Sequence, residues 1–265
     1  MVICVLIVCG GLGFLVHSQL LFIYQHRKEY PTFALACKKN LSLQSKIVLK
    51  TTFFLVVSGT LLFFCLEYHN PQTIGTLPLG HKAVTSLFQS ITYRTAGFST
   101  VNLGEAVTAS QFIGIIFMFI GASPASTGGG IKTTTIAVLL YKLRSTFHGE
   151  LETTYRQRTI GSKTIASALM IASLAGLLVL VTTALLTISE PDIPFIALLF
   201  EAVSAFSTTG LSLGITMELN AFSKILLILS MFIGRVGLLT LIYAISDRDT
   251  PLRTIKYPTQ EISVG

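Results

Sequence analysis

Two short segments carry the residue types from which a chain can build a cation site without carboxylates. They are Thr95-Ala96-Gly97-Phe98-Ser99 and Thr208-Thr209-Gly210-Leu211-Ser212. Each joins small hydroxyl residues to one glycine, and glycine adopts backbone conformations that other residues resist. Carbonyl oxygens beside it can turn inward and replace the water around a cation. We therefore predict two ion filters that bind a cation through the backbone carbonyls of Thr95, Gly97, Thr208 and Gly210. Neutral oxygen ligands suit a monovalent cation better than calcium or magnesium.

A short apolar run precedes each filter, in the stretches FQSITYRTAGFS and FEAVSAFSTTGLS. Each run has about 12 residues, whereas a bilayer-spanning helix needs roughly 20. Such a run is typical of a re-entrant segment or of a buried core helix. We predict pore helices over Gly80–Thr92 and Asp192–Phe206, whose carbonyl ends carry partial negative charge toward the ion path.

A helix-breaking run, Ala122 to Gly130, interrupts an apolar segment that resumes at Ile131. One proline and three consecutive glycines cannot sustain a helix. At membrane depth such a break survives only where it lines a cavity or is buried in protein. A loop outside the bilayer is the alternative, but the apolar segments on both sides are too short to span alone.

Four charged residues lie within or beside these apolar elements. Arg235 either anchors one helix to another or lies beside the ion path, where it could hold the interrupted loop or raise a barrier to cations. Lys132 either acts similarly or extends toward the membrane surface. Arg94 is expected to support the first filter as a donor, or to lie on the outer surface. Glu201 is expected to be a tethered structural carboxylate rather than an ion ligand.

The two filters belong to a longer duplication. Gly97 and Gly210 are 113 positions apart, and the run Met-Phe-Ile-Gly recurs at the same spacing. We take residues 47–147 and 158–246 as two helix–pore-loop–helix repeats, the first with an interrupted second helix. Val2 to Tyr24 is predicted to be one spanning helix that runs from the outside to the cytoplasm. Its Gly10-Gly11-Leu12-Gly13 resembles Gly234-Arg235-Val236-Gly237, so residues 1–24 are interpreted as the closing helix of an earlier, truncated repeat.

The composition predicts an all-α integral membrane protein. The chain is 51% hydrophobic and only 12% charged, with a mean hydropathy of +0.72, whereas soluble domains carry about 25% charged residues. We expect five spanning helices, one of them interrupted, and two re-entrant pore helices. The formal charge of +7 gathers in the connections 25–46 and 142–163 and in the tail 247–265. This asymmetry predicts that those three segments are cytoplasmic and argues against nucleic acid as a partner; membrane lipid is expected around the chain.

No enzyme is predicted. Gly128-Gly129-Gly130-Ile131-Lys132-Thr133 resembles a phosphate-binding loop, but Ile131 occupies the place where that motif needs glycine. Gly121-Ala122-Ser123-Pro124 lacks the glycine that should follow a catalytic serine, and no spanning helix supplies a convincing histidine base.

The stretches FQSITYRTAGFS, GASPASTGGGIKTTT, FEAVSAFSTTGLS and GRVGLLTL together resemble the Trk/Ktr/HKT superfamily of potassium transporters, and most closely its Ktr-type membrane subunits. The resemblance implies four repeats around one pore, of which this chain holds the last two and part of the second, so that missing upstream repeats are needed to complete the pore. It implies that Ser123 to Lys132 form an intramembrane gate, with Arg235 as the basic residue near it. The residues assigned to this gate are Ser123, Pro124, Ser126, Gly128, Gly129, Gly130, Lys132 and Arg235. The resemblance further implies a homodimer and a cytoplasmic nucleotide-binding regulatory ring.

The predicted function is channel-like uptake of potassium through a filter of pore-loop carbonyls in the cell membrane. No cofactor is expected; potassium is the substrate, with sodium coupling left open. The alternative is a non-conducting membrane scaffold or regulatory subunit that keeps the fold.

Overall fold

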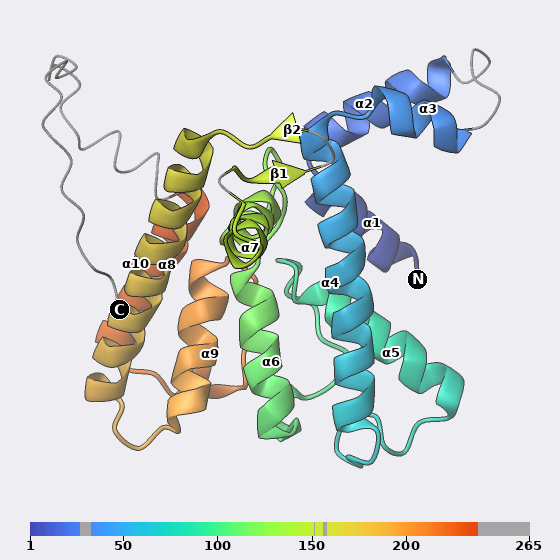
Figure 1. The fold of residues 1–265 in the computed structure, drawn as a ribbon. Helices are drawn as coiled ribbons and strands as arrows, with labels where there is room; N and C mark the ends of the chain where they lie inside the picture. Colours follow the sequence, from blue (N-terminus) through green and yellow to red (C-terminus); the bar gives the residue numbers. More distant parts are fainter. Residues whose placement is uncertain (27–32, 151, 156–157, 238–265) are drawn as a thin grey trace, which may run out of the picture.

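The computed structural model describes residues 1–26, 33–150, 152–155 and 158–237. Its helices, apart from two short 3₁₀ turns at Leu103–Glu105 and Ile215–Met217, form one bundle in which α4, α6, α9 and α8 stand upright beside one another (Figure 1). The bounds are α1 (Val2–Leu12), α2 (Phe14–Gln25), α3 (Phe33–Asn40), α4 (Leu43–Glu67), α5 (Leu79–Thr92), α6 (Thr108–Phe119), α7 (Thr133–Phe147), β1 (Thr154–Tyr155), β2 (Arg158–Thr159), α8 (Ser162–Ser189), α9 (Phe195–Phe206) and α10 (Ala221–Val236).

Two helices in the described chain, α4 and α8, are long and apolar enough to cross a membrane by themselves. The pair α1 and α2 passes the same test only as one span, which bends by 103°. The prediction of one continuous helix over Val2–Tyr24 is therefore wrong, because the chain breaks at Gly13, where φ is 85°. The expected count of five spanning helices stays a prediction, as do the bounds of the two repeats.

The three segments predicted to close a repeat all break at matching positions. The first breaks at Gly13, and the last ends at Gly237, which has φ 90° and ψ 131°. The interrupted helix α6–α7 breaks near Ala125, which has φ 57°. Figure 1 shows α6 upright and α7 almost end-on, so the chain changes direction sharply across that break. Helix α10 ends at Val236, and residues 238–265, with the predicted tail 247–265 among them, lie outside the described part of the chain.

The second pore helix, α9, is the most enclosed element of the bundle. Nine of its twelve residues are buried, among α6, α8 and α10. Phe200 packs in the largest apolar cluster together with Met118, Val203 and Phe206. A largely apolar helix is covered either by protein or by the membrane, and here other helices of the protein cover α9. This burial places the carboxyl end of α9 inside the molecule; in the filter that follows, Thr209 and Leu211 are buried, whereas Gly210 is exposed.

Two buried or half-buried carboxylates tie the far end of the bundle, and the sequence analysis missed both. Glu67 accepts hydrogen bonds from Asn70 Nδ2 at 2.7 Å, from Thr73 Oγ1 at 2.7 Å and from the Val107 N–H at 2.9 Å. Glu190 accepts from the Asn220 N–H at 2.7 Å. Val107 and Asn220 are the N-caps of α6 and α10, so each carboxylate fixes the start of the second helix of its repeat. The signal in the sequence is a glutamate at the end of a long apolar run.

Candidate filters and the loop beneath them

The two predicted filters have the same irregular backbone. Positive φ occurs at Thr95 (63°) and Gly97 (76°) in the first, and at Thr208 (54°) and Gly210 (85°) in the second. A non-glycine residue with positive φ is uncommon and persists only when the surrounding structure holds it there. The strained threonine therefore stands two residues before the glycine in both filters, a pattern that neither a helix nor a strand contains.

The two filters lie against each other. A Cβ atom built on Gly97 would lie 2.5 Å from the carbonyl oxygen of Thr209, and one built on Gly210 would lie 3.8 Å from the Cα of Gly97. These segments are 113 positions apart in the sequence. The fold thus brings Thr95, Ala96, Gly97 and Phe98 together with Thr208, Thr209, Gly210 and Leu211.

Hydrogen bonds hold the amide side of each filter and leave the carbonyl side unpaired. The Ala96 N–H donates to Thr92 O at 3.2 Å, and the Thr209 N–H donates to Ser204 O at 2.9 Å, so both filters are tied back to their pore helices. Within the described residues, no hydrogen bond reaches the carbonyl oxygens of Thr95, Gly97, Thr208 or Gly210. Thr95, Gly97 and Thr208 are half-buried and Gly210 is exposed, so these carbonyl oxygens are free to bind water or a cation.

The interrupted loop between α6 and α7 lies directly on the filters. The Gly129 N–H donates to Thr208 Oγ1 at 3.1 Å, and a Cβ on Gly128 would collide with Thr95 Oγ1. A Cβ on Gly130 would lie 3.2 Å from the Cβ of Ser207. The glycine run therefore allows the loop to approach both filters more closely than any side chain would permit.

Two cations hold carbonyl oxygens of this loop. Lys132 Nζ donates to Gly128 O at 2.6 Å. Arg235 Nη1 donates to Thr127 O, 108 residues away in the sequence. Of the alternatives for Arg235, the structure has the contact with the interrupted loop.

The first half of the loop is fixed to the break between α1 and α2. The Phe14 N–H donates to Ala125 O at 2.9 Å, and the Ser123 N–H donates to Gly11 O at 3.1 Å. Ser126 Oγ donates to Ser123 O at 2.6 Å, and Thr133 Oγ1 donates to Ser123 Oγ at 3.0 Å. A Cβ at Gly13 would collide with the carbonyl oxygen of Pro124. The loop is thus attached to three separate parts of the chain, and Ser123 is its fully buried corner.

The charges behind the filters differ between the repeats. Glu201 is buried and accepts from Ser212 Oγ and, at 3.0 Å, from Thr216 Oγ1, which fits a structural tether of the second filter. Arg94 is buried, and its Nε and Nη2 atoms have no hydrogen-bond partner in the described chain. The expected support of the first filter by Arg94 is therefore not seen as a contact. Lys82, in α5, is buried and donates to Tyr68 O at 2.8 Å.

Apolar helices around two unpaired carbonyl segments define a multi-pass helical membrane protein of the ion-transport class. Comparison with known proteins names the family. The family described as TrkH, cation transport protein, matches residues 1–250. The chain belongs to this family, whose potassium-transporter membrane subunits include the Ktr proteins, and its relatives are transport proteins rather than enzymes.

Curated relatives match the chain along its whole length. Ktr system potassium uptake protein B of Bacillus subtilis is 37% identical over 100% of this chain and 56% of the relative. The Vibrio alginolyticus protein of the same name is 36% identical over 98% of this chain and 54% of its own length. Potassium/sodium uptake protein NtpJ of Enterococcus hirae is 31% identical over 100% of this chain and 57% of the relative. The chain thus spans about half the length of the curated relatives it matches.

The fold has a counterpart among solved structures. The potassium transporter TrkH of Vibrio parahaemolyticus superposes with a TM-score of 0.71 over 92% of this chain and 51% of that protein. The two sequences are 19% identical, so this likeness concerns the fold alone.

Proposed function

We propose that the chain forms part of a channel-like pathway for potassium uptake across the cell membrane. The observation that carries the proposal is the set of unpaired carbonyl oxygens of Thr95, Gly97, Thr208 and Gly210 on two segments that face each other. Rings of backbone carbonyls replace the hydration shell of a monovalent cation. The names of the relatives from Bacillus subtilis and Vibrio alginolyticus point to potassium, and that of the Enterococcus hirae relative adds sodium as a second ion, so sodium coupling stays part of the proposal.

The two pore helices support cation selectivity. The carboxyl ends of α5 and α9, at Thr92 and Phe206, lie immediately before the two filters. The carbonyl end of a helix carries about half a negative charge, so both helices favour a cation without any carboxylate in the filter. The membrane potential then supplies about 2.3 kcal/mol per elementary charge per 100 mV, which drives uptake without hydrolysis in this chain.

The loop from Ser123 to Lys132 acts as the gate in this proposal. Its Gly129 N–H donates to Thr208 Oγ1, and Lys132 and Arg235 donate to two of its carbonyl oxygens. Occupation of the space next to both filters obstructs the ion path, and the two cations add an electrostatic barrier there. Movement of the loop away from Thr208 opens the path.

The assembly follows from the number of filters. A ring of four filter segments needs two more than this chain supplies, and the proposal takes them from upstream repeats of the complete transporter. The complete subunit pairs as a homodimer in the cell membrane and binds a cytoplasmic nucleotide-binding ring. The connections 25–46 and 142–163 and the carboxyl-terminal tail face the cytoplasm in this arrangement.

Rubidium uptake in a bacterium that lacks its own potassium transporters tests the proposal. The chain is expressed with upstream repeats supplied from a relative. A second strain carries the variant Gly129→Pro, which lacks the N–H that donates a hydrogen bond to Thr208 Oγ1. We expect uptake with the wild-type chain and altered uptake with the variant. Absence of uptake from the completed protein, at normal membrane expression, would favour the non-conducting scaffold.

A further inference from the structure

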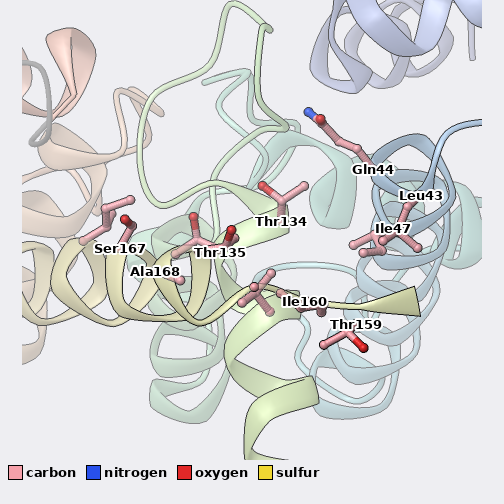
Figure 2. Close-up of a pocket in the computed structure, with 13 residues that line it drawn as sticks. Leu43, Gln44, Ile47, Thr134, Thr135, Thr159, Ile160, Ser167 and Ala168 are labelled. Atoms are coloured by element: carbon pink, nitrogen blue, oxygen red, sulfur yellow. The ribbon is translucent and has the colours of Figure 1, made fainter. Parts of the chain in front are cut away.

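A pocket with both polar and apolar lining residues lies between α4, α7 and α8, away from the filters. An open cavity of about 450 Å³ lies between the start of α4, the amino-terminal halves of α7 and α8, and the end of β2. We call it the α4–α7–α8 pocket. Figure 2 shows Ile47 of α4 on one side and Ser167 and Ala168 of α8 on the other, with Thr134 and Thr135 of α7 between them. Its volume falls within the range of about 300–1,000 Å³ that is usual for small-ligand sites.

The pocket has an apolar floor and a polar rim. Ile47, Val138, Ile160 and Ala168 form the floor and are buried. The rim is exposed and carries Gln44, Thr159, Gly161 and Thr164. A ligand that fits both parts must be an amphiphile, with a hydrocarbon portion inside and a polar portion at the opening.

Hydroxyl groups inside the pocket lack partners. Thr135 is 8% exposed, and its hydroxyl makes no hydrogen bond within the described chain. Ser167, on α8, likewise makes none. Hydroxyls elsewhere on the same helices return to the carbonyl four residues earlier, as Thr183 Oγ1 does to Val179 O at 2.8 Å. The Thr135 hydroxyl is not among the enclosed unpaired atoms of the described chain, so it opens into the pocket, where it is available to a ligand oxygen.

The charge at the rim defines the class of amphiphile. Arg158 and Lys163 are exposed and precede the rim residues Thr159 and Thr164 in the sequence, although neither of them lines the pocket. The opposing charge is Glu152, whose Oε2 accepts from Thr159 Oγ1 at 3.0 Å. The pocket also receives the amino end of α8, which has no side-chain cap and carries partial positive charge. The balance favours an anion.

We propose that the α4–α7–α8 pocket binds one anionic phospholipid of the cytoplasmic leaflet. An acyl chain fills the apolar floor, ester oxygens accept from Thr135 and Ser167, and the phosphate lies near Lys163 and Arg158. Because Lys132 is the N-cap of α7 and holds Gly128 O, the lipid packs on the helix that continues from the proposed gate. The leaflet and this link to the gate rest on the proposed function, whereas binding itself does not.

Lipid retention by the purified 265-residue chain tests the site without any measurement of transport. The chain is delipidated in detergent, titrated with phosphatidylglycerol or phosphatidylcholine, and analysed by native mass spectrometry. We expect one tightly held phosphatidylglycerol and weaker binding of phosphatidylcholine. Lys163→Gln should weaken phosphatidylglycerol about fivefold, since one basic residue near an anionic lipid contributes about that factor. Lys224→Gln, an exposed lysine at the start of α10, should change nothing.

Ser167→Leu should fill the floor and weaken phosphatidylglycerol at least about tenfold. Ser173→Leu is the matched control, because Ser173 is exposed on the same helix and bonds to Leu169 O. Equal lipid binding by these two leucine variants, or equal affinity for both lipids in the wild type, would overturn the proposal. A third result would also overturn it. If the wild type retained no phosphatidylglycerol and the cysteine of Ser167→Cys did not react with a maleimide, another protein segment would fill the pocket.

Discussion

Replacement of Gly97 by alanine should damage the protein far more than replacement of Gly210, although both are filter glycines. The left-handed conformation costs a residue with a Cβ about 1–2 kcal/mol, and both glycines have positive φ. Only at Gly97 does the new methyl group also meet backbone, 2.5 Å from Thr209 O, whereas at Gly210 its nearest neighbour is 3.8 Å away. Such overpacking adds about 1–3 kcal/mol, so the totals are about 2–5 kcal/mol for Gly97→Ala and about 1–2 kcal/mol for Gly210→Ala.

Both variants are measured in two ways. Apparent melting temperature in detergent, on the 265-residue chain, should be several degrees lower for Gly97→Ala than for Gly210→Ala. In the completed transporter, the ratio of potassium to sodium uptake should fall more for Gly97→Ala, because the displaced Thr209 carbonyl belongs to the opposite filter. Equal losses in both variants, or a larger loss for Gly210→Ala, would refute the close approach of the two filters.

Deletion of Ala125–Gly129 should raise ion flux in the completed transporter, because it removes the loop that touches Thr208; unchanged uptake at matched expression would exclude a gate there. Arg235→Gln should raise uptake about two- to tenfold by release of one loop carbonyl, and Arg235→Lys should restore most of the control; uptake equal to wild type in both would argue against this contact as a barrier. Glu67→Gln should lower the free energy of unfolding by about 1.5–3 kcal/mol, since the buried carboxylate accepts three hydrogen bonds. Chemical denaturation measures this loss, with Glu105→Gln at an exposed glutamate as the control; equal free energies of unfolding for the two variants would contradict the prediction. The 265-residue chain alone should not carry rubidium into liposomes, because it supplies two of four filter segments, and robust uptake would point to a two-fold pore.

Local sequence patterns predicted the bounds of several helices and the glycine-containing segments that follow the two pore helices. Helix α5 begins one residue before the predicted Gly80 and ends at the predicted Thr92, and α9 ends at the predicted Phe206. The prediction succeeded because run length, glycine, proline and apolar composition act within a few residues of each other. The internal offset of 113 positions marked the two filters as equivalent, because a repeat can be detected by comparing two parts of the sequence without any knowledge of contacts.

The pairing of polar groups, in contrast, depends on contacts between segments that lie far apart in the sequence. The contact of Arg235 with Thr127 and that of Gly129 with Thr208 join residues 108 and 79 positions apart, and no local pattern specifies such a pair. The bend at Gly13 escaped prediction because a glycine inside an apolar run is compatible with a continuous helix until the loop carbonyl of Pro124 packs against it. The unpaired filter carbonyls are likewise a property of the fold. The filter amides of Ala96 and Thr209 donate to carbonyl oxygens of the pore helices, which leaves the filter carbonyl oxygens free to bind an ion.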